Sequence, residues 1–342
     1  MISQTIQQRL EKLAERLERC RQSGQAVCLM PHENIDGDAI GSCLALLLAL
    51  EQLNIKVFLP LDEPVPSRLD FLPACDRIMP VQQIGRDGNV PEDSLALLID
   101  CSECQRTGKR SELCERFSEH WVIDHHITDR LVSEQEIIDT HAAASAEIVF
   151  ELIRILEAKY KQTLISHDGA VLLMTALISD TGGFVFSNTS SRSFYMAAEL
   201  MDHSIQLHDI TYRLFRQSTR ARIRLMGMIF SDARFFLDNR VVVGVVPAHV
   251  MEQLQATDDD LDGIINQLRN VSGVDMALVF REQPDCTIRV NIRSSAAVDA
   301  SLLARSFGGG GHPRAAGMTL TGQSLSQAEI IVLEKAGEQL SQ

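Results

Sequence analysis

Histidines and aspartates occur at several points where buried strands or helices are predicted to end, and they supply two imidazoles and four carboxylates: His32, Asp36, Asp38, Asp100, His125 and Asp180. Such a mixture of nitrogen and oxygen ligands suits manganese, magnesium or iron better than a metal that prefers thiolates. Asp36 and Asp38 can diverge on a bend at Gly37, so that each faces a different ion. A single carboxylate such as Asp100 can then bridge the pair. Two ions roughly 3.5–4 Å apart can hold an attacking hydroxide and stabilise the leaving oxygen of an in-line phosphoryl displacement.

Each of these residues also has a purely structural explanation. An aspartate after a strand often caps a helix or forms a turn, and Asp38 alone could cap a helix that starts near Ala39. Residues 124–126 could form a polar turn, and Asp180 could end a helix before the breaker TGG. Four such explanations would have to hold together at four predicted element ends, which favours the metal interpretation.

The surrounding sequence alternates short apolar runs with helical patterns. Branched apolar runs predict strands at 27–30, 55–61, 95–100 and 120–124. Helical periodicity lies between and after them, at 39–53, 142–160 and 168–180. This alternation predicts an α/β fold with a doubly wound, largely parallel sheet, in which ligands bind beyond the carboxyl ends of the strands. The acids that follow these strands are expected at that edge.

At 342 residues the chain is long enough for two domains with separate cores. We expect a metal-binding catalytic domain at 1–190, a helical connector at 191–232 and a smaller α/β domain at 233–342. The last has a predicted hairpin that turns at Asp238–Asn239. A helix at 259–271, strands at 274–282 and 286–295 and a helix at 299–307 follow in the sequence, and this order indicates a mixed sheet. Residues 1–20 carry apolar side chains at helical spacing and predict an amphipathic surface helix, not a targeting signal.

Composition limits the partners. The net charge is −14, whereas affinity for long nucleic acid comes largely from neutralised phosphates. A long duplex is therefore a poor partner. A small phosphorylated substrate needs only local cations. No apolar run approaches the roughly 20 residues that span a bilayer, so no membrane partner is expected. The eight cysteines are scattered, and several lie in apolar surroundings that suit reduced thiols in a cytoplasmic protein. Cys101 and Cys104 form a lone CSEC, and no second pair supports a zinc or redox role for it.

Five motifs, taken together, resemble a known family. HENIDGDAIGS, LLIDCSECQR, VIDHH and ALISDTGGF occur in the order of the four motifs of the DHH phosphoesterases, and FGGGGHPRAAG resembles the glycine-rich motif of the DHH-associated C-terminal domain. The resemblance covers the chain from about residue 20 onward, and the two-domain length is most similar to the nanoRNase/pAp phosphatase group. Those enzymes hydrolyse very short oligoribonucleotides and 3′-phosphoadenosine 5′-phosphate (pAp). One departure is Ile35, where the family commonly has proline, and this change removes a fixed φ but no ligand.

The resemblance implies a role for each residue of the metal site. One ion would be bound by His32, Asp36 and Asp100, and the other by Asp38, Asp100, His125 and Asp180. His126 would face the scissile phosphate and steady its charge or protonate the leaving group. Asp124 would fix the tautomer of an imidazole. The two ions would be manganese, with magnesium as the alternative, and no covalent enzyme intermediate is expected.

Substrate contacts are expected in both domains. Arg106 lies six residues beyond Asp100 and could reach a phosphate from the same rim, or it could be an ordinary surface arginine. In the second domain the segment RSS ends a predicted strand. Arg293 offers a planar fork for phosphate there and Ser294 offers a hydroxyl, and the resemblance implies a substrate contact at this point.

The run GGGGH near the C-terminus is a second candidate for substrate binding. Gly309, Gly310 and Gly311 lack a Cβ, so their backbone N–H groups can approach a ligand closely. His312 and Arg314 would add charge-assisted contacts to a terminal phosphate or stack on a base. A flexible loop without a ligand is the alternative. A dinucleotide-binding fingerprint is disfavoured, because that motif follows an early strand and opens a long helix.

The leading expectation is a metal-dependent phosphoesterase for short oligoribonucleotides and pAp that acts on chain ends and does not cut internally. A phosphodiesterase for cyclic or linear signalling dinucleotides is the first alternative. A catalytically inactive nucleotide-binding protein is the second, although all six metal ligands are present. The motif GGGGHPRAAG argues against an inorganic pyrophosphatase, and the acidic composition argues against a processive exonuclease. The oligomeric state is open, and a homodimer is compatible with the sequence.

Overall fold

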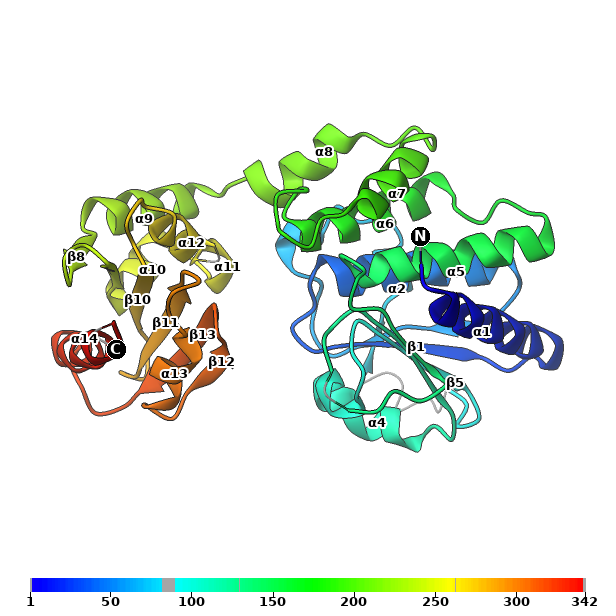
Figure 1. Cartoon of the computed structure of the whole chain (residues 1–342), viewed down its shortest axis with the longest axis horizontal. Helices are drawn as coiled ribbons and strands as arrows, with labels where there is room; N and C mark the ends of the chain where they lie inside the picture. Colours follow the sequence, from blue (N-terminus) through cyan, green and yellow to red (C-terminus); the bar gives the residue numbers. More distant parts are fainter. Residues whose placement is uncertain (1, 82–89, 129, 262, 341–342) are drawn as a thin grey trace. The chain divides into compact units, whose positions relative to one another are not determined.

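Two units, each with its own hydrophobic cores, make up the chain. A computed structural model describes residues 2–81, 90–128, 130–261 and 263–340. Unit 1 is Met1–Gln217 and unit 2 is Ser218–Gln342, and Figure 1 traces them from blue to red. The helices expected in a connector are divided between the units, with 191–217 in unit 1 and 218–232 in unit 2. The functional division at residues 190 and 232 stays a prediction.

Unit 1 is built on a five-stranded sheet in which all neighbouring strands are parallel. The strands are β1 (Val27–Pro31), β2 (Val57–Phe58), β5 (Leu95–Ile99), β6 (His120–Asp124) and β7 (Glu136–Ile138), and β3 (Pro60–Leu61) pairs separately with β4 (Met79–Pro80). Their spatial order is β2-β1-β5-β6-β7, so the direction of winding reverses between β1 and β5. Ligands of doubly wound sheets bind at such a reversal. The predicted parallel α/β architecture is confirmed.

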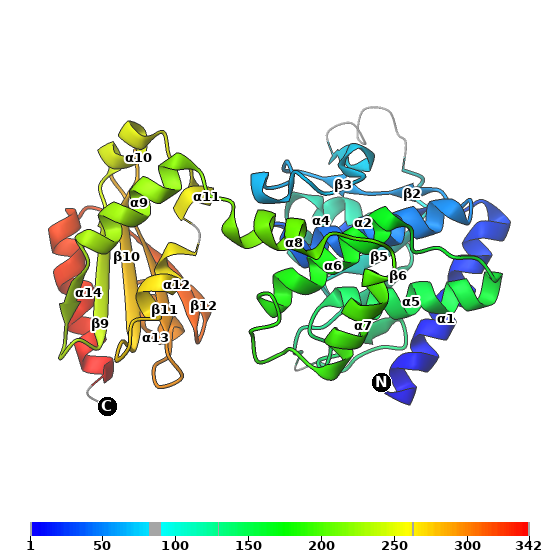
Figure 2. The same cartoon turned by 90° about the horizontal axis from the view of Figure 1, so that it is seen from above.

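Alternate residues of the central strands point to opposite faces of this sheet. Val27 and Leu29 pack into one core, whereas Cys28 and Met30 pack into another on the far face. The larger core lies under α1 (Gln4–Ser23), α2 (Gly37–Gln52), α5 (Ser145–Tyr160) and α6 (His167–Thr181), and the smaller one lies under α4 (Ser111–Arg116). Figure 1 shows α2 and α5 on one side of the sheet and α4 on the other, and Figure 2 shows unit 1 from above, with its helices projected over the strands. Burial on both faces explains why the strands read as continuous apolar runs.

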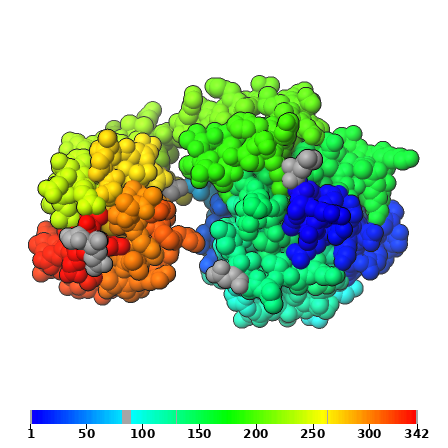
Figure 3. Space-filling view, in the orientation of Figure 1, coloured from blue at the N-terminus to red at the C-terminus, as the bar shows by residue number. Residues whose placement is uncertain are grey.

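The amphipathic helix predicted at the N-terminus is α1. Its side chains Leu10, Leu13 and Leu17 are fully buried, and Figure 3 shows the outer face of the helix, in dark blue, at the surface of unit 1. Helices α7 (Ser191–Met201), α8 (Leu207–Thr211) and the single turn η4 (Tyr212–Arg216) complete the unit. None of the described helices combines the length and the apolar character needed to cross a membrane.

One expectation about the cysteines is wrong for two of them. Cys104 and Cys114 form a disulfide, and the other six cysteines are free. The chain leaves β5, makes the short helix η3 (Cys104–Arg110) and turns into α4, which brings the two Cα atoms to 5.6 Å. The sequence separation of ten residues gave no recognisable pairing motif.

The parallel register brings the ends of three strands to one edge. Pro31 of β1 pairs with Ile99 of β5, and Ile99 pairs with Ile123 of β6. The next residues along these strands include His32, Asp100 and Asp124, so the histidine and both acids emerge side by side. The expectation that these acids meet at the carboxyl edge of the sheet is therefore confirmed.

Unit 2 contains a six-stranded mixed sheet with the order β12-β13-β11-β10-β9-β8. The strands are β8 (Arg234–Phe236), β9 (Val241–Val246), β10 (Met276–Glu282), β11 (Ile288–Ser294), β12 (Gly310–His312) and β13 (Ala315–Leu320). Only β9 and β10 run parallel to each other. Helices α13 (Ala300–Arg305) and α14 (Leu325–Leu340) cover one face, and α9 (Arg220–Ser231), α10 (Ala248–Leu254) and α12 (Ile264–Arg269) cover the other.

Two local predictions for unit 2 need correction, and one is confirmed. The hairpin between β8 and β9 turns through Asp238–Asn239, both with positive φ, as expected. The helix predicted over 259–271 is broken into α11 (Asp258–Leu261) and α12, because Gly263 has a φ of +75°; Asp262 lies outside the described residues. The run GGGGH is no free loop, since Gly310–His312 pairs with β13 as an edge strand.

Candidate metal centre

A first group of ligand atoms surrounds the start of α2. His32 Nε2 lies 3.3 Å from Asp100 Oδ2 and 3.7 Å from Asp36 Oδ2. One donor atom from each of these three residues lies within 4.8 Å of the others. His32 and Asp100 are buried, and Asp36 is half-buried, so the group opens to solvent on the Asp36 side. This is the first of the two predicted ligand sets.

A second group forms around His125. Its Nε2 lies 3.2 Å from Asp180 Oδ2, 3.5 Å from Asp100 Oδ1 and 3.9 Å from Asp38 Oδ2. The Asp180 carboxylate arrives from the last turn of α6, far from the sheet edge in sequence. Asp100 therefore turns one oxygen toward each histidine, Oδ2 toward His32 and Oδ1 toward His125. All six sequence-predicted ligands meet in this one cluster.

The first turn of α2 fixes the two aspartates of the opening motif. Asp36, and not Asp38, is the N-cap, and its Oδ1 accepts a 3.0 Å hydrogen bond from the Ala39 N–H. Asp38 is fully buried inside the helix and accepts hydrogen bonds from the backbone N–H groups of Ser145 (2.6 Å) and Ala146 (3.0 Å). The N-termini of α2 and α5 thus converge on Asp38, and helix N-termini favour negative charge. The capping interpretation of Asp38 is wrong.

Close packing between α2 and α6 brings Asp180 to the cluster. A Cβ on Gly37 would lie 2.6 Å from Cβ and Oγ of Ser179, and a Cβ on Gly41 would lie 2.6 Å from the Leu172 carbonyl oxygen. Only glycine permits this approach at both positions. The glycine between Asp36 and Asp38 is therefore needed for helix contact, and the bend expected there is the start of the helix itself.

The acids of the cluster repel one another. Burial raises the pKa of Asp38 well above its usual value, and the nearby charges of Asp100, Asp180 and Asp36 raise it further. Burial also raises the pKa of Asp180, with Asp36 and Asp100 adding to the rise. Buried carboxylates this close together stay ionised only when a cation lies among them. The donor set therefore fits a hard or borderline metal ion.

The neighbouring carboxylates also raise the pKa of both histidines in the cluster, because they favour positive charge there. Burial lowers the pKa of His32, but contacts with Asp100 and Asp36 outweigh it and raise the value to about 10. Burial likewise lowers the pKa of His125, and its contacts with Asp180 and Asp100 outweigh it and raise the value to about 9. The buried His125 Nε2 nevertheless makes no hydrogen bond. A ring nitrogen that faces three carboxylates without a hydrogen bond is well placed to bind a metal.

Asp124 and His126 form a pair beside the cluster. His126 Nδ1 lies 2.7 Å from Asp124 Oδ1, and the His126 side chain is 43% exposed. Burial by itself raises the pKa of Asp124, but the hydrogen bond and charge of His126 outweigh it and hold the pKa below its usual value. Asp124 is buried, so it orients a ring that reaches solvent. The expected tautomer-fixing role of Asp124 thus has His126 as its partner.

Two residues outside the predicted set support the centre. Ser145 Oγ donates a 2.9 Å hydrogen bond to Asp100 Oδ1. Arg110, almost fully buried, donates from Nη2 to the His32 carbonyl oxygen at 3.0 Å. Ser145 stands at the start of a predicted helix, where a serine is ordinarily interpreted as a cap, and no spacing pattern connects Arg110 with the motifs. Sequence reasoning therefore missed both.

The substrate-binding residues predicted in unit 1 and unit 2 differ in whether their side chains are exposed or already hydrogen-bonded within the fold. Arg106 is exposed, and its carbonyl oxygen accepts a 2.8 Å hydrogen bond from the Glu33 N–H next to His32. In unit 2 the buried Ser294 hydroxyl donates to the Val298 and Pro313 carbonyl oxygens, each at 2.8 Å. Arg106 is thus on the rim of the metal cluster, whereas the Ser294 hydroxyl already takes part in the fold.

The glycine-rich segment lies against β13. A Cβ on Gly309 would lie 2.4 Å from the Gly317 carbonyl oxygen, and Gly311 has a φ of +138°. His312 is exposed at the end of β12. Arg314 donates to the carbonyl oxygens of the loop after β11: Ser295, Ala296 and Val298. Arg293 lies beside it on β11, and its Nε donates to Asn266 Oδ1 at 3.2 Å. The structure gathers these residues at one end of the unit 2 sheet.

A parallel sheet whose carboxyl edge carries two histidine–carboxylate groups joined by one aspartate defines a metal-dependent phosphoester hydrolase. Family models agree: "DHH family, N-terminal domain" matches residues 26–177 and "DHHA1 domain" matches residues 238–339. The chain belongs to the DHH family of phosphoesterases.

Curated relatives and a solved structure resemble the chain over nearly its full length. The bifunctional oligoribonuclease and PAP phosphatase NrnA of Thermus thermophilus is 32% identical over 92% of this chain and 90% of its own. The protein of the same name from Bacillus subtilis is 27% identical over 86% of this chain and 89% of its own. An exopolyphosphatase-related protein from Bacteroides fragilis has a TM-score of 0.86 at 23% identity, covering 97% of this chain and 96% of that one. The last comparison shows a shared fold.

Proposed function

We propose that the chain hydrolyses short oligoribonucleotides and pAp with the help of two divalent ions, and that these ions are manganese. The names of the two bifunctional relatives, which match over most of both chains, support this pair of substrates. The carboxylate-rich donor set with two imidazoles supports manganese over zinc, which is held more often by thiolates and imidazoles. Magnesium is the alternative, although it is bound through fewer protein ligands and more waters.

The observation that carries the proposal is the placement of Asp100. Its Oδ2 lies 3.3 Å from His32 Nε2 and its Oδ1 lies 3.5 Å from His125 Nε2. One carboxylate between two ligand groups is the arrangement that holds a pair of ions close together. Asp100 has a φ of +62°, an uncommon conformation for aspartate that costs of order 1–3 kcal/mol and concentrates at functional sites.

The assigned roles follow from these contacts. His32, Asp36 and Asp100 would hold one ion, and Asp38, Asp100, His125 and Asp180 would hold the other. When bound, the ions would activate the attacking water and neutralise charge on the phosphate. His126, oriented by Asp124 and exposed to solvent, would donate a proton to the leaving oxygen or a hydrogen bond to the phosphate. Arg106 would steer the phosphate from the rim.

Unit 2 would supply substrate contacts of its own. Gly309, Gly310 and Gly311 would offer backbone N–H groups to a terminal phosphate or base, and His312 would add an exposed ring. Arg293, Ser294 and Arg314 would shape that end of the sheet, since hydrogen bonds within unit 2 engage all three side chains.

We further propose a cytoplasmic place of action. Six of the eight cysteines are free thiols, which is usual in reducing compartments and unusual in secreted domains.

The net charge of −14 disfavours binding to long nucleic acid and is compatible with small nucleotides guided by local cations. A homodimer remains a prediction from the sequence.

The proposal is tested by hydrolysis of defined substrates. Purified protein is incubated with Mn²⁺ and, separately, with pAp, a linear diribonucleotide, a cyclic dinucleotide and pyrophosphate, and the products are resolved by chromatography. His125→Ala is the inactive variant. His208→Ala is its matched control, because the His208 side chain is 79% exposed, lies beside Asp209 and stacks on the Tyr212 ring, away from the metal cluster in sequence.

We expect Mn²⁺-dependent loss of pAp and the linear diribonucleotide by the unmodified chain and by His208→Ala, and no loss with His125→Ala. Cleavage of the cyclic dinucleotide alone would assign the chain to signalling-nucleotide turnover. Binding of nucleotides without any cleavage would contradict the hydrolytic mechanism and favour a binding protein.

A further inference from the structure

A second cluster of metal-binding side chains lies on the α4 side of the sheet in unit 1. Cys104 begins η3, Cys114 lies in α4, and His120 is the first residue of β6. Both sulfur atoms and one ring nitrogen of His120 lie within 4.8 Å of one another. The sulfurs are joined as a disulfide in this structure. The cluster contains none of the residues of the DHH metal centre.

In the disulfide the two sulfurs are bonded to each other, so they must separate before both can bind one tetrahedral ion. Zinc bonds of about 2.3 Å to sulfur and about 2.0–2.1 Å to nitrogen place neighbouring ligand atoms roughly 3.3–3.8 Å apart. Opening the disulfide lets the sulfurs separate toward that distance by small side-chain rotations. His120 is held in place by a 2.8 Å contact between its Nε2 and the Cys114 carbonyl oxygen, which ties the ring to the residue that carries one sulfur.

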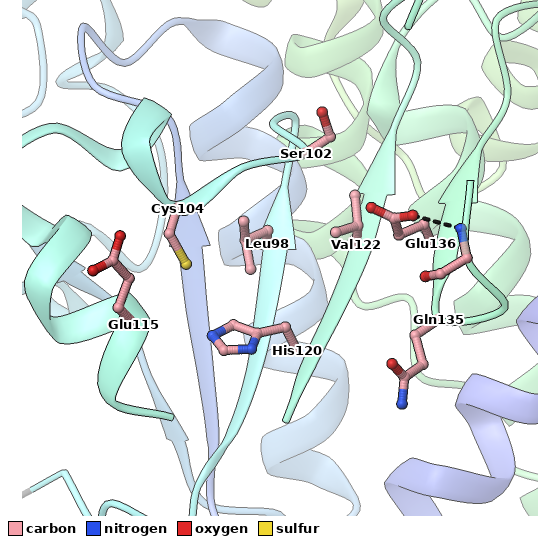
Figure 4. Close-up of a pocket in the computed structure, with 9 residues that line it drawn as sticks. Leu98, Ser102, Cys104, Glu115, His120, Val122, Gln135 and Glu136 are labelled. Carbon is pink, nitrogen blue, oxygen red and sulfur yellow. Dashed lines mark hydrogen bonds between the residues drawn. The ribbon is translucent and has the colours of Figure 1, made fainter. Parts of the chain in front are cut away.

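The cluster is reachable from solvent. A cavity of about 330 Å³ is lined by Cys104 and His120 together with Glu115, and its inner wall includes Leu98 and Val122. Figure 4 shows the Cys104 sulfur and the His120 ring directed into the same space between β5, β6 and the segment that leads to α4. Glu115 also lines this cavity and is exposed, so water can reach the fourth position. An ion therefore has an entry path.

We propose that the reduced chain binds one thiolate-preferring divalent ion, such as zinc, through Cys104, Cys114 and His120, and that the disulfide and the metal-bound form exclude each other. A dithiol reductant transfers two electrons and two protons to the disulfide, which gives two thiols and leaves the reductant as its own disulfide. Metal binding then displaces one proton from each thiol, so both sulfurs bind as thiolates.

Ligand chemistry separates this site from the centre that contains Asp100. Two thiolates and one imidazole form a soft donor set that selects zinc and similar ions, whereas four carboxylates select manganese or magnesium. The two sites are nevertheless connected by the chain, because η3 carries Arg106, whose carbonyl oxygen accepts the Glu33 N–H beside His32. The thiol site thus includes the first residue of η3, the segment that is hydrogen-bonded to the backbone next to His32.

Cobalt(II) spectroscopy tests the site, because only thiolate ligation gives a strong sulfur-to-cobalt charge-transfer band in the near ultraviolet. The full-length chain is reduced with a phosphine until all eight cysteines titrate as thiols after denaturation, and is then titrated with Co²⁺ alone. The same titration is done with the disulfide form. Cys104→Ser, Cys114→Ala and His120→Gln are the test variants, and Cys286→Ser, an exposed free cysteine, is the matched control.

We expect the band to saturate with one Co²⁺ at this site per reduced chain, beyond the ions taken up by the Asp100 centre, and to do so equally in Cys286→Ser, with Zn²⁺ displacing it. The band should be absent from the disulfide form and from both cysteine variants. His120→Gln removes a direct ligand and should weaken binding by about 100-fold, which is the largest loss usually seen when only an outer contact is removed. Circular dichroism identifies any variant that fails to fold, and mass spectrometry of the zinc-loaded native chain gives the ion count. A reduced, folded chain without the band, or a band that persists in Cys104→Ser, overturns the proposal.

Discussion

Ser145 donates a hydrogen bond from Oγ to Asp100 Oδ1 at 2.9 Å, the same carboxylate oxygen that lies 3.5 Å from His125 Nε2. The backbone N–H of Ser145 also donates to Asp38 Oδ2 at 2.6 Å. One residue at the start of α5 therefore orients the shared carboxylate and a second acid of the cluster. Such outer contacts set the direction in which a ligand presents its lone pairs.

Removing the Ser145 hydroxyl should weaken metal binding without unfolding the chain. Ser145→Ala keeps the backbone contact to Asp38 but frees Asp100 to rotate, and loss of a contact of this kind typically costs about 10–100-fold in metal affinity. The measurement is Mn²⁺ activation of pAp hydrolysis together with free Mn²⁺ by electron paramagnetic resonance. Ser94→Ala is the control, since Ser94 is buried just before β5 and its hydroxyl makes no hydrogen bond. Equal Mn²⁺ titrations for both variants would show that Ser145 does not orient the ligand.

Gly37→Ala tests the close approach of α2 to α6. The added Cβ would lie 2.6 Å from Ser179, so the helices must separate, and overpacking of this kind costs about 1–3 kcal/mol of unfolding free energy. Activity should fall more than stability, because Asp36 and Asp38 move away from Asp180. Gly227→Ala places the same methyl group in α9, where nothing lies within 4 Å, and should stabilise the chain by up to about 1 kcal/mol. Chemical denaturation and hydrolysis assays measure both, and an active Gly37→Ala variant would contradict the account.

His126 is expected to act on the leaving group and not to bind metal. His126→Ala should lower kcat for pAp by about 10²–10⁴, the usual range for a general acid, while the Mn²⁺ content stays unchanged. A nitrophenyl phosphoester, whose leaving group needs no proton, should lose much less. Asp124→Asn should show the same pattern more weakly, since the amide oxygen still accepts from His126 Nδ1 but carries no charge. A parallel loss on both substrates would assign His126 a role other than proton donation.

The sequence predicted the metal ligands better than it predicted the residues that hold those ligands in place. The ligand motifs follow strands whose carboxyl ends meet at one edge, so strand prediction alone placed His32, Asp100 and His125 together. Asp180 was named from its motif, but its approach to the cluster depends on packing between α2 and α6 at Gly37 and Gly41, which no local pattern signals. The contacts of Ser145 and Arg110 are tertiary, and no periodic pattern encodes them.

In unit 2, too, local sequence patterns predicted several elements but missed pairings and breaks that depend on the rest of the fold. The sequence predicted strands at β10 and β11, but the pairing of Gly310–His312 with β13 was hidden because glycine has low strand propensity. The helix expected through Gly263 broke there, since its φ of +75° is incompatible with a continuous helix. The disulfide was missed because two cysteines ten residues apart form no recognised motif.

The ion pair between Arg16 of α1 and Glu119 gives a pH-dependent prediction. Arg16 donates from Nε and Nη2 to the two oxygens of Glu119 at 2.8–2.9 Å, and these bonds hold the pKa of Glu119 below its usual value. A carboxylate whose folded pKa is lowered stabilises the fold fully above its unfolded pKa of about 4.3, and this contribution is lost as pH falls through the folded pKa. Because Glu119 is partly exposed, solvent screening limits the effect to about 1 kcal/mol.

Glu119→Gln should therefore be less stable than the unmodified chain at pH 7, and the difference should shrink as pH falls below about 4.3 and vanish below the folded pKa of Glu119. Urea denaturation across this pH range measures it. The exposed pair of Lys12 with Glu134 supplies the control, since Glu134→Gln should change nothing measurable. A difference that grows on acidification would contradict the sign of the shift.

His312 and Arg314 should separate substrate binding from stability in unit 2. His312 is exposed, so His312→Ala should raise KM for pAp and leave the unfolding temperature unchanged. Arg314 donates to the Ala296 carbonyl oxygen at 3.1 Å and to that of Val298 at 2.9 Å, so Arg314→Ala should lower the unfolding temperature. Calorimetry and steady-state kinetics measure the two effects. A stability loss in His312→Ala alone would reverse the assignment.

The central claim is that Asp100 joins two metal ions, and anomalous X-ray scattering from crystals soaked in Mn²⁺ tests it most directly. The account predicts two peaks about 3.5–4 Å apart, one bounded by His32 and Asp36 and the other by His125 and Asp180, with Asp100 between them. A single peak, or two peaks of which only one contacts Asp100, would contradict the two-ion mechanism.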